Sequence, residues 1–114
     1  MMHFVQQRFG DVEVLSLKGK LIGSPETDKL YDRVKSILAE DIKKIVIDLK
    51  HIHWLASLGM GALMRCVMTA RAENGDLYLA GLSEKVKNLF SITKLVGVVK
   101  IFDTVNEAVQ EFSK

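Results

Sequence analysis

The sequence predicts a single α/β domain over residues 1–114, with a mixed, mostly parallel sheet of four or five strands flanked by four helices. Two observations carry this prediction. Apolar runs of strand length alternate with amphipathic stretches of helix length, an order typical of parallel strands joined by helical crossovers. The chain also opens with two strand-like segments around Gly10-Asp11, a hairpin signal that adds an antiparallel strand.

Turn and capping residues separate the expected elements. Strands are expected at residues 4–8, 12–18, 45–49, 77–82 and 98–102. Ser24 followed by Pro25 predicts the start of the first helix, with Ser24 as the N-cap and Pro25 at the first helical position. The other helices have expected N-caps of the same kind: Ser57, Ser83, and Thr104 in a capping box with Glu107. The third helix is expected to turn one side inward, formed by Val86, Leu89, Phe90 and Thr93.

The strand at residues 12–18 has apolar residues on both of its faces. Leu15 and Leu17 are expected to face the core, although Val12 and Val14 on the opposite face leave the choice open. The strand at 45–49 is also apolar on both parities, as in a strand that is covered on both sides.

Composition narrows the classes of function. The formal net charge of +2, without a run of Lys or Arg, does not favour a nucleic-acid partner. One cysteine cannot form an internal disulfide, which favours a reducing setting. The longest nearly apolar run, at 52–64, is well short of the roughly 20 residues that span a bilayer, and residues 1–5 lack a signal-peptide pattern. We therefore expect a cytoplasmic protein without a membrane span.

The segment 54–61 joins the central strand to the second helix, and we expect the functional site there. Sites in open α/β sheets cluster where parallel strands end. A helix start also exposes free N–H groups and a partial positive charge. Gly59 and Gly61 carry no side chains, so another molecule could approach the first turn closely.

With these elements placed, the chain resembles a STAS domain (sulphate transporter and anti-sigma factor antagonist) of the stand-alone antagonist kind. Four segments carry the resemblance: 14–21 with its Gly19-Lys20-Leu21 exit, 45–49 ending in Asp-Leu, 56–63 on the family's Asp-Ser-Ser-Gly-Leu-Gly signature, and the closing segment 102–108. Their order and spacing extend over nearly the whole chain, which makes the resemblance specific for the fold.

The resemblance implies a regulator of transcription that works by partner switching, without a cofactor and without enzyme activity. In similar domains, an unmodified antagonist binds an anti-sigma factor, which is itself a serine kinase related to histidine-kinase ATPases. That binding frees the sigma factor. Phosphorylation of the second serine of the signature breaks the complex, and a phosphatase restores it. The implied partners are therefore this kinase and a phosphatase, and a homo-oligomer is left open.

The sequence departs from the family signature at two positions. Ala56 replaces the family aspartate, and Leu58 stands at the phospho-acceptor position, where it offers no oxygen. Ser57 matches the preceding family serine and is the candidate phospho-acceptor left in the motif. Three hypotheses follow: a permanently binding-competent antagonist, which we favour, an antagonist modified at Ser57, or a scaffold protein. A non-catalytic STAS subunit of a transporter or signalling assembly is the alternative function.

The expected partner-binding surface is the start of the second helix with its neighbouring loops. Its residues are Ala56, Ser57, Leu58, Gly59, Met60, Gly61 and Met64. Met60, Met64 and Met68 recur at helical spacing, either as a flexible apolar ridge for a partner or as core residues. Leu58 likewise either presents its side chain to the partner or turns inward and packs.

Motifs for ligand or metal binding are incomplete here. Gly59-Met60-Gly61 lacks the third glycine of a dinucleotide fingerprint, and the sequence has no Gly-Lys-Ser/Thr loop. His51 and His53 have strand spacing, but a zinc site needs three or four ligands. Surface histidines are the favoured interpretation, and no metal is expected.

Two further residues keep alternative interpretations. Trp54 is either an anchor for a partner or a half-buried core residue. Ser57 as a nucleophile would need a histidine base and an orienting carboxylate within reach, and nothing in the sequence indicates an oxyanion pocket. We expect no catalytic residues.

Overall fold

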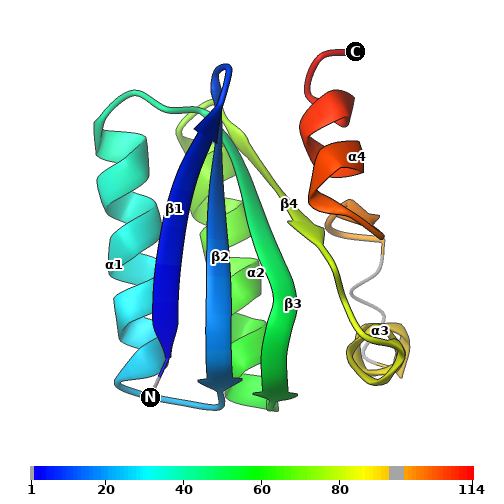
Figure 1. Ribbon diagram of the computed structural model, residues 1–114. Coiled ribbons are helices and arrows are strands. Elements are labelled where there is room, and N and C mark those ends of the chain that lie inside the picture. The colour runs from blue at the N-terminus through cyan, green and yellow to red at the C-terminus, as the bar shows by residue number, and fades with distance from the viewer. Residues whose placement is uncertain (1, 93–96) are drawn as a thin grey trace.

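A computed structural model describes residues 2–92 and 97–114 of the protein. Within these residues the strands and helices alternate after an opening hairpin (Figure 1). In chain order they are β1 (His3–Phe9), β2 (Val12–Leu21), α1 (Glu26–Ala39), β3 (Lys44–Leu55), α2 (Ser57–Ala72), β4 (Asp76–Ala80), α3 (Glu84–Ile92), β5 (Ile101–Phe102) and α4 (Val105–Glu111).

The strands form one five-stranded sheet in the order β1-β2-β3-β4-β5. β1 pairs antiparallel with β2, and every later pairing is parallel. Gly10 forms the hairpin turn with a positive φ of 63°, a conformation that glycine adopts without steric cost. The predicted mixed, mostly parallel sheet with flanking helices is confirmed.

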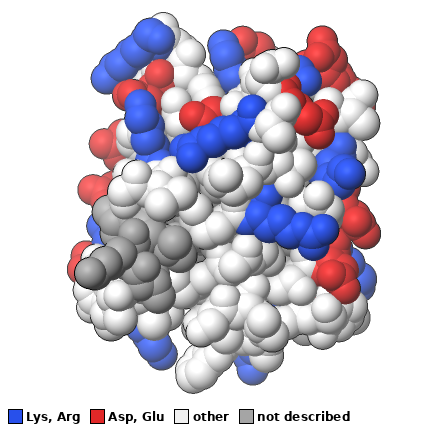
Figure 2. All heavy atoms as spheres, turned by 180° about the vertical axis from the view of Figure 1, so that it is seen from behind, with Lys and Arg blue, Asp and Glu red and all other residues white. Residues whose placement is uncertain are grey.

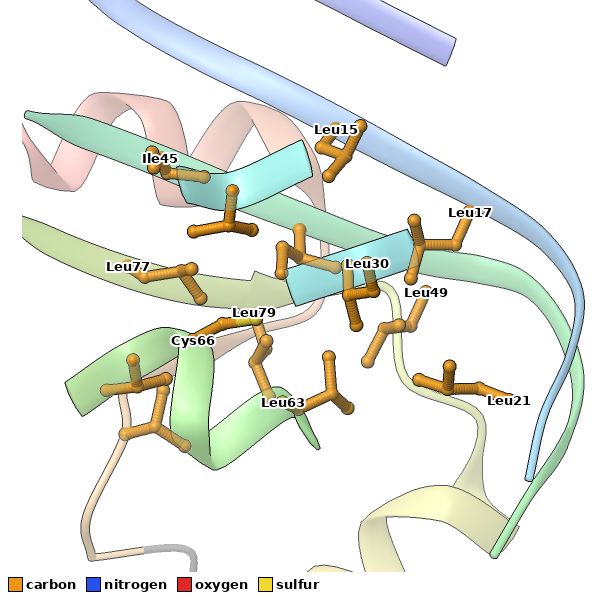
Figure 3. Packing of buried hydrophobic residues seen from close by; sticks show 14 of the residues in the cluster. Leu15, Leu17, Leu21, Leu30, Ile45, Leu49, Leu63, Cys66, Leu77 and Leu79 are labelled. Atoms are coloured by element: carbon orange, nitrogen blue, oxygen red, sulfur yellow. The ribbon is translucent and has the colours of Figure 1, made fainter. Parts of the chain in front are cut away.

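Each face of the sheet has its own apolar cluster. On one face, α1 and α2 cover the larger cluster, in which Leu15, Leu17, Leu30 and Leu63 interdigitate (Figure 3). On the other face, α4 covers a smaller cluster: Val12, Val14, Val46, Tyr78, Ala80 and Ala108. Both faces of β2 are therefore buried over residues 12–15. The sequence had left open which of its two faces lies against the core, and the structure covers both.

β3 is longer than its apolar run predicts. The strand was expected to end at residue 49 but continues to Leu55, because β2 also continues and pairs with it as far as Leu21. Two register shifts accommodate extra residues in β3 over this stretch. β5 is shorter than predicted: the strand was expected at residues 98–102, and the structure has it at Ile101–Phe102. The predicted inward position of Thr93 lies outside the described residues.

Two of the predicted helix caps are wrong, and two are confirmed. Pro25 is the N-cap of α1, and the Ser24 hydroxyl donates to Asp28 Oδ2 at 3.0 Å instead of capping. Ser57 is the first residue of α2, whose N-cap is Ala56, and no side chain caps this helix. Ser83 accepts from the Val86 amide at 3.2 Å, and Thr104 forms its full capping box with Glu107. None of the helices in the described residues is long and apolar enough to cross a bilayer.

Candidate partner-binding site

The start of α2 is fixed against the end of β2. The Ala56 amide donates to the Leu21 carbonyl oxygen at 3.2 Å, and the Met60 amide then donates to the Ala56 carbonyl oxygen at 3.0 Å. Ala56 has an extended backbone, with φ −110° and ψ 173°, so the chain turns sharply from strand into helix. This corner places the first turn of α2 at the carboxyl edge of the sheet, where parallel α/β folds carry their sites.

The two glycines of the first turn have different roles. A Cβ on Gly59 would collide with the Leu21 carbonyl group and lie 2.9 Å from a methyl carbon of Leu55. Gly59 therefore lets the chain itself approach closely, not a ligand. A Cβ on Gly61 would meet nothing within 4 Å, so Gly61 faces open space. The prediction of close approach by another molecule is thus wrong for Gly59 and stays a prediction for Gly61.

Leu58 projects from this corner into solvent. Its side chain is 71% exposed, so the alternative that it turns inward and packs is wrong. Ser57 beside it is also exposed, and Ile22 at the end of β2 is a second exposed apolar residue. Seen from the α1/α2 side, the end of the molecule where both helices begin is largely free of charged residues (Figure 2). A surface with few charges and a projecting leucine is suited to a protein contact.

A groove of about 300 Å³ runs between the first turns of α1 and α2. Its lining residues are Ser24, Thr27, Asp28, Tyr31, Ser57, Leu58, Gly61, Ala62 and Arg65. The Arg65 guanidinium carbon lies 3.6 Å from the centre of the Tyr31 ring, so two of the lining residues form a cation–π contact. A hydrogen bond with Thr69 chiefly lowers the pKa of Tyr31, and the charges of Lys35 and Arg65 add to this.

The residues that α1 contributes to this groove were missed in the sequence. The missed signal is topological: α1 and α2 follow neighbouring parallel strands on the same face of the sheet, so their first turns lie side by side. Arg65 was missed because a single arginine on a helix gives no pattern.

The predicted contact residues separate into exposed and buried groups. Ala56, Ser57, Leu58, Gly61 and Met64 are exposed or half-buried, and we call these five residues the helix-start surface. Gly59 and Met60 are buried, with Met60 only 4% exposed in the main core, so neither can present a side chain to a partner. The methionine ridge is therefore wrong at Met60, while Met68 is exposed.

Within the described residues, this corner shows neither a catalytic hydrogen-bond arrangement at Ser57 nor a cluster of metal ligands. No hydrogen bond joins the Ser57 hydroxyl to a histidine within residues 2–92 and 97–114. The same part of the chain contains no group of three or more His, Cys, Asp or Glu side chains that could hold a metal ion. Asp48 accepts from the Ser16 hydroxyl at 3.2 Å and from the Lys50 amide at 3.0 Å, as a structural carboxylate does.

The structure is a small α/β domain with an exposed leucine at the start of α2. The family model of the STAS domain matches residues 4–108, and the chain belongs to that family. A candidate anti-sigma factor antagonist of Thermotoga maritima is 30% identical over 74 residues, which cover 65% of this chain and 66% of that relative. The alignment thus spans just under two thirds of the relative's length.

Solved structures agree with this assignment. The crystal structure of a candidate anti-sigma factor antagonist of Thermotoga maritima has a TM-score of 0.87 at 25% identity, covering 97% of this chain and 95% of that one. The unphosphorylated anti-sigma factor antagonist SpoIIAA has a TM-score of 0.73 at 14% identity, covering 97% of both chains, which shows a shared fold. The chain is therefore related to anti-sigma factor antagonists, a regulatory and generally non-enzymatic class of protein.

Proposed function

We propose that the whole chain, residues 1–114, acts in the cytoplasm as an anti-sigma factor antagonist that binds a kinase-type anti-sigma factor through the helix-start surface. The observation that carries the proposal is the position of Leu58, 71% exposed at the first turn of α2. Because the helix start already fixes its backbone, covering this leucine costs only the side-chain entropy, about 0.5–1 kcal/mol. Burial of one leucine contributes about 1.5–3 kcal/mol to such a contact.

The same residue removes the usual switch. A phosphate on a serine would add about −1.5 to −2 charges and a desolvation cost to the contact surface. Leu58 cannot accept a phosphoryl group, so the charge that breaks the complex in similar domains cannot form there. The protein therefore stays in its binding-competent state while phosphorylatable antagonists cycle between partners.

Ser57 carries the remaining hydroxyl of the signature motif. It is the residue that could accept a phosphoryl group in place of Leu58. It is exposed at the first residue of α2, and its side chain makes no cap hydrogen bond. Its position alone does not make it a substrate, because a kinase must also reach it in the complex. A phosphorylated Ser57 would restore partner switching with the acceptor moved by one residue.

The test uses the chain of residues 1–114 and a kinase-type anti-sigma factor encoded near its own gene. The two proteins are mixed with and without ATP, and the complex is followed by size exclusion while intact mass reports modification. We expect a stable complex in both conditions and an unchanged mass. Gain of one phosphoryl group, mapped to Ser57, would replace the permanently competent antagonist by a switched one.

The same experiment distinguishes the antagonist from the alternative function, a subunit of a transport or signalling assembly. If no kinase-type anti-sigma factor binds and the neighbouring genes encode a permease and an ATPase, the chain is a STAS subunit of a transport assembly. A signalling scaffold would instead be recovered in a multi-protein complex that lacks a sigma factor. Either result would overturn the antagonist proposal.

A further inference from the structure

The face of the sheet opposite α1 and α2 carries a row of basic side chains at its carboxyl end. His3 of β1, Lys18 of β2 and His51 of β3 are register partners across three neighbouring strands. Lys20 and Trp54 form the next exposed pair along β2 and β3, after the intervening pair of Gly19 and Ile52. Side chains at paired positions point to the same face of a sheet, so these five residues form one continuous surface.

The alternation of β2 fixes which face this is. Leu15, Leu17 and Leu21 are buried in the cluster beneath α1 and α2. Lys18 and Lys20 have the opposite parity and are exposed, so they point away from those helices. No described helix lies in front of the lower halves of β1, β2 and β3 (Figure 1). We call this area the basic sheet face: His3, Lys18, Lys20, His51, Trp54, and Lys85, which α3 adds beside Trp54.

The lysines of the basic sheet face have no carboxylate partners. Within residues 2–92 and 97–114, no Asp or Glu side chain forms an ion pair with Lys18, Lys20 or Lys85. By contrast, Lys87 on α3 pairs with Asp103 at 2.9 Å, and Lys44 pairs with Asp11 at 2.7 Å. Positive charge is therefore left uncompensated on this face, whereas Lys87 and Lys44 are each paired with a carboxylate.

Trp54 gives the basic sheet face an apolar centre. Its side chain is 53% exposed, and the Lys85 ammonium lies 4.5 Å from its ring centre. An exposed tryptophan is a typical anchor of a protein interface, since its ring is apolar and its N–H can donate a hydrogen bond. The carboxylate of Asp48 accepts hydrogen bonds from the Ser16 hydroxyl and the Lys50 amide, and within the described residues it forms no ion pair with Lys18, Lys20 or Lys85.

We propose that the basic sheet face docks an acidic polypeptide segment of a partner, with carboxylates on Lys18 and Lys20 and an apolar side chain on Trp54. Charge complementarity favours this occupant. A nucleic acid is disfavoured because the four arginines of the chain, the residues best suited to phosphate forks, lie elsewhere: Arg8, Arg33, Arg65 and Arg71. This docking surface is separate from the helix-start surface and does not depend on the function proposed for it.

Trp54 is the only tryptophan in the sequence, so intrinsic fluorescence reports directly on this surface. The probe is a synthetic peptide in which glutamates flank one central leucine, and its control carries glutamine in place of every glutamate. We expect the acidic peptide to change the fluorescence emission of the 1–114 chain saturably and the glutamine peptide to leave it unchanged. Backbone amide shifts should map the binding to β2 and β3.

Paired charge reversals locate the site. Lys18→Glu with Lys20→Glu should raise the dissociation constant at least about tenfold. Lys29→Glu with Lys35→Glu changes the net charge equally but lies on α1, across the sheet, and should change it less than about twofold. Both lysines of the control are exposed, so neither pair removes a core residue.

Each other outcome overturns the proposal. Equal losses in the two double variants would show attraction by net charge alone, and no response to the acidic peptide would show no site. A single-stranded oligonucleotide or anionic phospholipid vesicles that bind as tightly as the peptide would assign the face to nucleic acid or membrane. If the charge reversal on β2 unfolds the chain, the neutral pair Lys18→Gln with Lys20→Gln is used instead, and it should also raise the dissociation constant for the acidic peptide.

Discussion

The Leu21 carbonyl oxygen occupies the space that a Cβ on Gly59 would need. Leu21 ends β2, and Gly59 lies in the first turn of α2, so this contact brings helix and strand closer than any other residue would allow. The neighbouring hydrogen bond from the Ala56 amide to the same oxygen fixes the approach. The position of Leu58 at the surface depends on this contact, because Leu58 lies between the two anchored residues.

Gly59→Ala should therefore destabilise the protein. The added methyl meets backbone and not a flexible side chain, so the strand or the helix must shift, at a cost of about 1–3 kcal/mol in the free energy of unfolding. Gly61→Ala is the matched control, because its methyl meets nothing and alanine favours a helix by about 0.5–1 kcal/mol. Urea denaturation of both variants measures the difference. Equal effects would mean that α2 does not approach Leu21 this closely.

The different N-caps of α2 and α4 predict that two hydroxyl-to-alanine substitutions will differ in their effect on stability. Thr104→Ala removes the side-chain acceptor of the Glu107 amide, a bond of 3.1 Å, and should lower the free energy of unfolding by about 1 kcal/mol. Ser57→Ala removes a hydroxyl that caps nothing, and should change it by less than about 0.5 kcal/mol. Thermal denaturation of the two variants is the measurement, and a larger loss for Ser57→Ala would contradict the observed caps.

Most of this fold could be predicted because buried faces of strands and helices require apolar residues at regular spacings, and those spacings are visible in the sequence. The apolar residues on both faces of β2 and β3 and the apolar run of β4 required covered faces, and the helices α1, α2 and α4 cover them. The extension of β3 through His51 and Trp54 could not be predicted, since those residues are exposed and their strand conformation comes from pairing with β2. The residues of a segment do not show whether a neighbouring strand will pair with it.

The candidate site was only partly predictable for a related reason. Leu58 and Met60 are both apolar and two residues apart, and a helix turns one outward and the other into the core. Which of them faces outward depends on where α2 begins. The sequence placed the cap at Ser57, one residue late, whereas the bond from Ala56 to Leu21 starts the helix earlier. A tertiary contact therefore decides what the surface presents.

Cys66 should be chemically inert in the folded protein. Burial raises the pKa of its thiol from 9.0 to about 12, against a smaller opposing effect of the Arg65 charge. A raised pKa leaves less thiolate at any pH below it, so at pH 8 the folded chain should hold about a thousandfold less thiolate than the unfolded chain.

Reaction with an aromatic disulfide reagent measures this directly, because the sequence has one cysteine. The reaction should be very slow in native buffer and rapid in denaturant. A fast native reaction would show that α2 opens around Cys66 or that the thiol is accessible, in conflict with its burial in the main core.

The last prediction concerns the exposed leucine itself. Leu58→Asp should leave the free energy of unfolding within about 0.5 kcal/mol, since the side chain is exposed and a carboxylate near the start of a helix is electrostatically favourable. Binding to the anti-sigma factor should nevertheless weaken at least about tenfold, because the contact loses apolar area and gains a negative charge. Calorimetric titration of the purified partner gives both the affinity and the stoichiometry.

Met68→Asp is the matched control for Leu58→Asp. Met68 is also exposed, at 57%, and lies on the same helix, but it does not line the groove between α1 and α2. The same charge placed there should change the affinity less than about twofold. If both variants bind as tightly as the native chain, the partner does not contact α2. If both weaken equally, the negative charge acts through the field of the whole helix, and Leu58 holds no special place in the interface.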